Sequence, residues 1–468
     1  MKKKKWYTTM QTSLPSRVQR GVELARYCVR TYKNVRTIQK YGPRCPAADQ
    51  LVSDTAKIGV IALKMAQFLS ARGDVIDENT LEVIERFQNE VPIESFEPPD
   101  FTFYDFDKKY PIATASIASV FKGKRKVDNT DVVVKVIKPG VKQRIYEDLP
   151  LFILVLEGAK FFNIAGAENM LELVRECQPM LIGELDLRAE AKNQHFFKKN
   201  FKGIDWLTIP TVYEAGESYL ISEYVESRRI TSAHPNKILA RRMFELYLRS
   251  VIDIGLVQAD PHPGNVGVRS DGSFVLYDFG AVIDVRDVKP NIAKCLKCIV
   301  LEDSDGVIKA LEELGIIKSG GSSARLKKIV PKIKKILESP DANMELGKVE
   351  EFSSNTDRVF QLTTKYIYLI RSLTICEGII KYHDPKFSLN SYIKKYDDVI
   401  DDLVDVPVFD VVQQIAGDFM STPASVKNMN DVILEMNEKM TREIADAKKM
   451  MNYAMVLYIL AELIALVK

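Results

Sequence analysis

The stretch that most constrains this chain is 258–280, which reads QADPHPGNVGVRSDGSFVLYDFG. Its first part cannot lie inside a helix, because Pro261 and Pro263 lack a backbone N–H and bias the residues before them away from helical angles. The rest predicts a hairpin, since two β-rich runs flank a turn that contains Asp-Gly. The expected strands are 266–269 and 274–277, and the expected turn is 270–273.

Three oxygen-bearing side chains are expected at the mouth of this hairpin. Asn265 follows Asp260 by five residues, and the hairpin would fold Asp278 back toward both. Carboxylate and amide oxygens suit a hard cation that carries a phosphate. With Asp278-Phe279-Gly280, the spacing is that of the catalytic loop and metal loop of kinases. Asx-rich turns also occur in ordinary loops, so the interpretation depends on what lies upstream.

A kinase site requires an upstream lysine on a strand, and Lys135 lies in the β-branched run 132–137. A single lysine on a strand can equally be an edge charge. The loop that covers the phosphates should come just before this strand, but the segment there, 111–120, reads PIATASIASV and has no glycine. Its small residues would keep the chain close to a phosphate. Alanine in place of glycine disfavours positive φ, which predicts a stiffer loop.

Two acidic residues are expected to share a helix face. Asp186 and Glu190 are four residues apart in a helical pattern that runs from 171 to 197. Like charges at this spacing repel by roughly a few tenths of a kcal/mol unless a cation lies nearby. The pair therefore favours a nearby lysine, although Arg188 could also ease a merely solvated acidic face.

An earlier segment carries a lysine in an unusual setting. In 58–69, IGVIALKMAQFL, the only strongly polar side chains are Lys64 and Gln67, which share one face of an otherwise apolar helix. Considered alone, such a lysine is more commonly one whose stem packs on the core while its ammonium reaches solvent.

Together these segments resemble the UbiB family of atypical kinases, also called aarF-domain-containing kinases, over residues 50 to 300 and in the family's order. The family's Lys-x-Gly-Gln motif is matched by 64–67, with Ala66 in place of the glycine, and its alanine-rich loop by 113–116, with Thr114 where alanine is usual. The remaining motifs are matched by Glu184, Asp186, Glu190, Lys135, Asp260, Asn265 and Asp278.

The resemblance implies an α+β, bilobal protein kinase-like fold. It would have a small β-rich N-lobe, a helical C-lobe, an N-terminal helical extension and a C-terminal helical tail. In the family the extension covers the cleft where a protein kinase receives its peptide, so Lys64 and Gln67 would enter the nucleotide site and meet Glu184 and Asp186. Protein phosphorylation is then disfavoured. The implied activity is ATP binding and slow hydrolysis, linked in family members to isoprenoid quinone biosynthesis and lipid handling at membranes.

The same resemblance implies roles by position. Lys135 would pair with Glu190 and hold the α and β phosphates of ATP. Asn265 and Asp278 would bind Mg²⁺, and Asp260 would orient the acceptor hydroxyl or a water. Further contacts with the nucleotide would come from Ala113, Ala115, Ser116 and Val120 in the alanine-rich loop, and from the hinge residues Glu223 and Val225, which follow the strand-like 219–222.

Length and composition agree with this organisation. The chain has 468 residues, more than one ordinary domain. A formal net charge of +3 argues against a protein dominated by nucleic-acid binding. Six cysteines without an apolar signal segment indicate a reducing, intracellular compartment. Cys295 and Cys298 lie in a helical pattern with no second pair, so we expect structural cysteines rather than zinc ligands.

The expected divisions are a basic N-terminal segment 1–49, a helical extension 50–108, an N-lobe 109–224, a C-lobe 225–400 and a helical tail 401–468. Within them, helices are also expected over 291–301, 305–317 and 352–379.

Both ends of the chain suggest membrane contact. Residues 1–21 contain lysines and arginines but no acid, which fits a mitochondrial transit peptide, a flexible arm for anionic lipid or a solvated tail. Residues 450–467 are apolar almost all round but fall short of the ~20 apolar residues needed to span hydrocarbon. We therefore favour interfacial docking or packing on a partner for this segment.

The leading hypothesis is a Mg²⁺-dependent, UbiB-like atypical kinase or ATPase that works near a membrane, with a lipid or isoprenoid ligand. A nucleotide- or lipid-binding pseudokinase scaffold is the main alternative, and the intact kinase motifs count against it. A small-molecule phosphotransferase also uses Asp-x-x-x-x-Asn, but the alanine-rich loop and the Lys64 helix count against that function.

Overall fold

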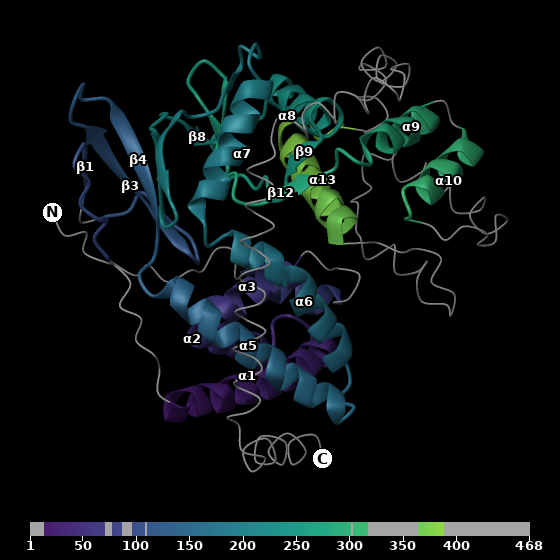
Figure 1. Cartoon of the computed structure of the whole chain (residues 1–468). Helices are drawn as coiled ribbons and strands as arrows, with labels where there is room; N and C mark the ends of the chain where they lie inside the picture. Colours follow the sequence, from purple (N-terminus) through teal and green to yellow (C-terminus); the bar gives the residue numbers. More distant parts are fainter. Residues whose placement is uncertain are drawn as a thin grey trace. The chain divides into compact units, whose positions relative to one another are not determined.

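The computed structural model describes residues 14–70, 77–86, 96–107, 110–300, 303–316 and 364–387 (Figure 1). The chain divides into two compact units. Unit 1 comprises 1–187, 214–221 and 423–468, and unit 2 comprises 188–213 and 222–422. The predictions for 1–13 and for the tail 401–468, with its apolar segment 450–467, lie outside the described residues.

Unit 1 begins with helices that pack on one another. They are α1 (Leu14–Tyr41), α2 (Pro46–Ile58), α3 (Val60–Leu69) and α4 (Glu78–Glu85). Their shared core contains Ile38, Leu51, Leu63 and Val83, one from each helix. Both α1 and α3 also contact α5 (Val141–Phe161), and α3 contacts α6 (Ala167–Gly183) (Figure 1). Helix α1 begins at Leu14, so the basic stretch 1–21 is helical in its described part.

The joint between α2 and α3 is held by one arginine. Gly59, at φ +99° and ψ −153°, separates the two helices, so the helix expected over 58–69 begins at Val60. Arg20 donates from Nε and Nη2 to the two carboxylate oxygens of Asp148, at 2.8 Å each, and from Nη2 to the Ile58 carbonyl at 2.7 Å. Asp148 is 2% exposed, and its hydrogen bonds raise the pKa of Arg20. Arg20, on α1, therefore links the end of α2 to α5.

Most residues of a sheet of short strands belong to unit 1. Among the described residues its order is β1-β3-β4-β7-β6, with β2 beside β3. The strands are β1 (Tyr104–Phe106), β2 (Ala113–Thr114), β3 (Ala118–Arg125), β4 (Asp131–Ile137), β6 (Val212–Gly216) and β7 (Tyr219–Glu223). In the antiparallel ladder of β3 and β4, Val120 lies opposite Lys135. The strand expected around Lys135 is thus present.

The prediction of a single helix over 171–197 is wrong. The chain forms α6 up to Gly183 and a second helix, α7 (Leu187–Asn200), with a break at 184–186. In the break, Asp186 N donates to the Gly183 carbonyl at 3.3 Å, and Leu187 N donates to the Glu217 carbonyl at 3.0 Å. Because this N–H bonds outside the helix, the helical ladder stops there. Asp186 and Glu190 therefore do not share a helix face.

Unit 2 holds α7 and the loop-hairpin-loop segment expected at 258–280. Strand β9 (Leu256–Gln258) pairs with β12 (Val282–Asp284), while β10 (Val266–Val268) and β11 (Phe274–Leu276) form the expected hairpin. The hairpin extends to a sheet of order β5-β11-β10-β8, with β5 (Leu207–Thr208) and β8 (Arg228–Arg229).

Helices surround these strands in unit 2. They are α8 (Lys237–Arg249), a π-helix (Ser250–Ile254), α9 (Lys289–Val300), α10 (Ser304–Glu313) and α13 (Thr364–His383). The helices expected over 291–301 and 352–379 are confirmed within the described ranges, whereas the helix expected over 305–317 ends at Glu313. Helix α13 lies beside α8, β9 and β12 (Figure 1). In the ranges that the structure describes, no helix combines the length and apolarity needed to cross a membrane.

Candidate active site

Lys64, on α3, forms an ion pair with Glu184 at the C-terminal end of α6. Both side chains are largely buried, at 13% and 20% exposure. The neighbours of Lys64, Leu63 and Met65, are buried in the helical core. The ammonium of this lysine therefore meets a carboxylate rather than solvent.

Two further residues of the expected cluster lie in the same unit. Gln67 follows Lys64 by one turn on α3 and is half-buried, and its backbone carbonyl accepts a hydrogen bond from Ser70 Oγ at 2.7 Å. Asp186 lies in the break after α6. Burial first, and then the negative charge of Asp186, raise the pKa of Tyr146 on α5 to about 12. The Asp186 carboxylate therefore lies near α5.

The alanine-rich loop forms a tight hairpin turn between β2 and β3. Ala115 N donates to the Ala118 carbonyl at 2.8 Å, and the hydroxyls of Thr114 and Ser119 lie 3.2 Å apart. Ala113 and Ala115 are exposed, whereas Ser116 is buried. No residue in 110–120 has positive φ, so the turn closes without the conformations that favour glycine. Through the pairing of Val120 with Lys135, the strand leaving this turn runs beside the lysine.

In unit 2 two strand pairs bring the predicted metal and catalytic residues together. Gln258 pairs with Val282, and Ala259 N donates to the Ala281 carbonyl at 3.0 Å, so the chain leaves β9 at Asp260 close to where it enters β12. The other hairpin ends with Tyr277 N donating to the Asn265 carbonyl at 2.9 Å. Each of Asp260, Asn265 and Asp278 lies at or next to one of these paired strand ends. The three residues therefore lie together at the mouth of the hairpin.

Side-chain amides fix the backbone of this mouth. Asn265 Nδ2 donates to the Asp260 carbonyl at 3.0 Å, which sets the orientation of the amide and leaves its oxygen on the other side. Gln258, 6% exposed, donates from Nε2 to the carbonyls of Tyr277 and Asp278 at 2.8 and 2.7 Å. Gln258, a residue that the sequence pattern did not single out, thus joins the predicted catalytic loop to the Asp-Phe-Gly segment.

Asp278 has an unusual backbone. Its φ is +56°, and its Oδ1 accepts a hydrogen bond from Gly280 N at 3.0 Å while the side chain remains exposed. The following Phe279 is fully buried, its ring 5.1 Å from that of Phe197, and its carbonyl accepts from Asn193 Nδ2 at 2.9 Å. The turn is therefore anchored on α7 and presents the Asp278 carboxylate outward.

Glu190 lies on α7 beside the same turn and is 5% exposed. A Cβ added at Gly280 would lie 3.4 Å from Glu190 Oε2 and 3.2 Å from Asp278 Oδ1. These two carboxylates therefore approach Gly280 closely, and a cation or cationic side chain would offset their repulsion.

The chemistry of the mouth fits Mg²⁺. Within the described residues, no donor lies in hydrogen-bonding distance of the buried Asp260 Oδ1. The same residues contain no group of three or more His, Cys, Asp or Glu side chains placed to hold a metal. A metal here would take oxygens from Asn265 and Asp278 and complete its shell with phosphate and water, which is the usual coordination of nucleotide-bound Mg²⁺.

The predicted hinge has contacts of its own. Glu223 Oε2 accepts hydrogen bonds from Thr211 N at 3.0 Å and Thr211 Oγ1 at 2.9 Å. The Val225 carbonyl accepts from Tyr277 Oη at 2.8 Å. The Glu223 side chain thus binds the backbone and the hydroxyl of Thr211. Tyr277, which links the predicted hinge to the predicted metal loop, was also missed from the sequence, because a tyrosine at the end of an expected strand ordinarily indicates packing.

The predicted residues fall into two groups. In unit 1 the structure joins Lys64 to Glu184 and places the alanine-rich loop beside the strand of Lys135. In unit 2 it gathers Asp260, Asn265 and Asp278. Lys135 and Glu190 belong to different units, so their pairing stays a prediction. Cys295 and Cys298, on α9, are free thiols, and burial raises the pKa of Cys295 to about 11.

Comparison with known proteins defines the class. Residues 77–311 match the family model described as the ABC1 atypical kinase-like domain. The chain is 64% identical over 447 residues to a protein of Paramecium bursaria Chlorella virus 1 named putative ABC transporter A445L, covering 95% of this chain and 96% of that one. The family match, with the mouth described above, places the chain among proteins of the protein kinase-like fold. It belongs to the ABC1 atypical kinase-like family.

Other relatives carry kinase names. The chain is 27% identical over 371 residues to the chloroplastic protein Activity of BC1 complex kinase 7 of Arabidopsis thaliana, covering 74% of this chain and 53% of that protein. It is also 27% identical over 366 residues to a probable protein kinase UbiB of Tolumonas auensis, covering 71% and 66%. The resemblance to UbiB kinases and the kinase-like α+β fold are confirmed. The chain spans only about half the length of the Arabidopsis relative.

Proposed function

We propose that this chain binds Mg-ATP and hydrolyses it or transfers its γ-phosphate, close to a membrane and in isoprenoid quinone or lipid metabolism. The observation that carries the proposal is the gathering of Asp260, Asn265 and Asp278 at one mouth in unit 2. Family membership supports it, since relatives at lower identity are named as kinases.

Each residue has a task in this proposal. Bound Mg²⁺ would neutralise phosphate charge, held by Asn265 and Asp278. Asp260 would accept a hydrogen bond from the attacking water or hydroxyl and so orient it. Lys135, paired with Glu190, would hold the phosphates. The alanine-rich loop (Ala113, Ala115, Ser116, Val120) would cover them, and the backbone of Glu223 and Val225 would contact adenine.

The Lys64–Glu184 ion pair bears on the choice of acceptor. Both partners are largely buried, so separating them would leave an uncompensated charge. The pair holds α3 against the end of α6, and the helical extension is thereby kept in place. We infer that Lys64, Gln67, Glu184 and Asp186 act as one group toward the nucleotide, and that water or a small acceptor is preferred over a protein substrate.

A transporter-type nucleotide site has no support in the sequence. Such sites use the phosphate loop G-x-x-x-x-G-K-[ST]. The chain has two Gly-Lys pairs, and neither completes the pattern, since Gly123-Lys124 is followed by Arg125 and Gly347-Lys348 by Val349. The proposed nucleotide chemistry therefore rests on the kinase-type residues.

An ATPase assay on the purified full chain tests the proposal. Phosphate release is measured with Mg²⁺ or with a chelator, and with no vesicles, neutral vesicles or anionic vesicles, beside an Asp260→Asn control. We expect Mg²⁺-dependent release that vesicles increase and the control lacks. Nucleotide binding without release would favour the pseudokinase scaffold, and phosphorylation of metabolites in a lysate would favour the small-molecule phosphotransferase.

A further inference from the structure

The predicted catalytic loop of this chain contains no permanently charged basic side chain. From Leu256 to Val268 the sequence contains no lysine or arginine. Among the described residues, a cation near the Asp260 carboxylate comes from a helix more than a hundred residues later. Arg371 Nη2, on α13, lies 3.8 Å from Asp260 Oδ2, with side-chain exposures of 12% for the arginine and 43% for the aspartate.

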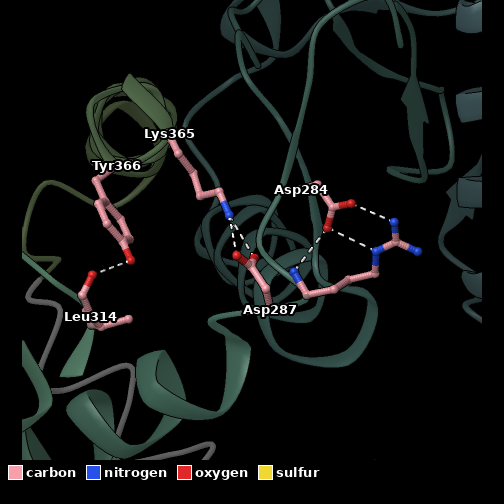
Figure 2. Close-up of polar contacts among 6 residues, drawn as sticks. Asp284, Asp287, Leu314, Lys365 and Tyr366 are labelled. Carbon is pink, nitrogen blue, oxygen red and sulfur yellow. Dashed lines mark hydrogen bonds and ion pairs between the residues drawn. The ribbon is translucent and has the colours of Figure 1, made fainter. Parts of the chain in front are cut away.

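Helix α13 is fixed at its N-terminal end. Lys365 Nζ contacts both carboxylate oxygens of Asp287, at 2.7 and 2.8 Å, and Tyr366 Oη donates to the Leu314 carbonyl at 2.7 Å (Figure 2). Figure 2 shows the two side chains leaving the helix toward different segments of unit 2. The start of α13 therefore has little freedom to rotate or slide.

The middle of α13 is fixed directly on the strand that leads to Asp260. Ser372, fully buried, donates from Oγ to the Gln258 carbonyl at 2.7 Å. Tyr247 Oη donates to the Leu369 carbonyl at 2.9 Å. Arg371 is the neighbour of Ser372, and Gln258 lies two residues before Asp260. The position of the guanidinium relative to the carboxylate is thus set by backbone anchors on both sides.

The distance between Arg371 and Asp260 fits a contact that positions the carboxylate. At 3.8 Å the guanidinium attracts Asp260 Oδ2 but lies beyond hydrogen-bonding length, so the carboxylate is restrained without being saturated. The other oxygen, Oδ1, is buried, and no donor among the described residues reaches it. Arginine suits this task because it stays charged under all working conditions and its planar group has a defined direction.

We propose that Arg371 is a positioning residue for Asp260. It holds the carboxylate at Oδ2 while Oδ1 stays buried, so that the exposed part of the carboxylate keeps the direction required to accept a hydrogen bond from the attacking water or acceptor hydroxyl. The inference rests on the proposed function, because Asp260 needs an orientation only if phosphate is transferred.

The test measures kcat, KM and Mg-ATP affinity for Arg371→Met. We expect kcat to fall about tenfold, because small misplacements of a catalytic group are costly, while KM and the calorimetric affinity stay within about twofold of the parent. Lys381→Met is the matched control, since Lys381 is a part-buried cation of the same helix, paired with Glu377. Its kcat should equal that of the parent.

A double-mutant cycle separates positioning from a general structural effect. In an Asp260→Asn background, Arg371→Met should lower the residual kcat by less than about twofold, because the group it positions is gone. An equal loss in both backgrounds would show that Arg371 acts independently of Asp260 and would overturn the proposal. An equal loss in Lys381→Met would do the same.

Other outcomes of these experiments also decide whether the proposal stands. If Arg371→Met melts well below the parent, Arg371→Lys replaces it: the ammonium keeps the charge but lacks the planar group, so we expect kcat to fall about threefold at unchanged affinity. A parental kcat in that variant overturns the positioning role. A parent chain with no turnover removes the proposed function, and this inference with it. An active parent with a parental Arg371→Met removes only the inference.

Discussion

At the scale of single residues, Asp278 combines a left-handed backbone with an exposed carboxylate. Asparagine tolerates the same backbone and can still accept from Gly280 N, so Asp278→Asn changes the charge with little change of conformation. We expect affinity for Mg-ATP to fall at least about tenfold, because an amide cannot balance the cation and phosphates. Affinity for metal-free ATP, titrated in parallel, should change much less. Unchanged Mg-ATP affinity would remove Asp278 from the site.

Lys64 gives a second prediction at this scale. Replacing it by methionine leaves Glu184 in a largely buried position without its cation, which should lower stability by about 1–3 kcal/mol. Adding Glu184→Gln should recover part of the loss. Melting temperatures of the parent, both single variants and the double variant measure this coupling. If the two single effects simply add, the ion pair contributes nothing and α3 is held by apolar packing alone.

Sequence reasoning found some residues of the site and missed others for a physical reason. Asp260, Asn265 and Asp278 stand at fixed spacings in one short segment, so a local pattern sufficed to predict their meeting. Gln258 and Arg371 are polar groups with ordinary neighbours in the sequence, and their contacts arise only once distant elements pack. The one available signal for Arg371 was its place as the only charged residue between Lys365 and Glu377 in an apolar run.

At the scale of elements, the joint between α2 and α3 depends on one glycine. Gly59 has φ +99° and ψ −153°, a region that only glycine adopts readily, and a Cβ there would meet nothing within 4 Å. Gly59→Ala should therefore cost about 1–3 kcal/mol through backbone strain alone. Gly183→Ala, at the end of α6 and equally open, has no positive φ and should be neutral or stabilising. Equal melting shifts for the two variants would contradict this account.

His383, at the C-terminal end of α13, should make the stability of the folded chain depend on pH. His383 is 2% exposed, its Nδ1 accepts from Asn236 N at 3.3 Å, and burial lowers its pKa from 6.5. Below about pH 6.5 the unfolded chain binds a proton that folded His383 resists, so the free energy of unfolding should fall, by at most about 1.4 kcal/mol per pH unit, until the folded pKa is reached.

A variant that lacks the imidazole isolates the contribution of His383 to the pH dependence. His383→Asn keeps an acceptor for Asn236 N and removes the titrating ring, so its melting temperature should fall less than the parent's between pH 7.5 and pH 5.5. A parental pH dependence in His383→Asn would assign the effect to other groups.

Element boundaries show where pattern reasoning stops. Periodicity correctly predicted the strand of Lys135, the hairpin after Asn265 and the helix that carries Lys64. It could not predict the break between α6 and α7, because the residues there remain compatible with a helix. The break depends on Leu187 N bonding to the Glu217 carbonyl, a partner thirty residues away in the sequence.

At the scale of the whole molecule, the order of motifs was enough to predict the class, because each motif is short and their sequence along the chain is specific as a set. The family match over 77–311 confirms that prediction. The assignment of 214–221 to unit 1 has a different origin. It depends on pairing such as Ile137 N with the Ser218 carbonyl at 2.9 Å, which joins segments far apart in the chain and has no local signature.

The proposed membrane association concerns the whole chain and supplies the last prediction. Residues 450–467 are apolar almost all round and stand at the end of the sequence given, far in sequence from the kinase motifs. Because an apolar stretch of this length falls short of a membrane span, we expect it to bind the interface of a bilayer rather than cross it. Removing 450–468 should therefore lower recovery in flotation with anionic vesicles at least about threefold, while Mg-ATP affinity stays parental. The Asp278→Asn chain is the matched control, because it should lose nucleotide and still float. Parental recovery of the shortened chain would exclude this segment as the attachment, and a sharp fall in its melting temperature would show that the segment packs into the folded core instead.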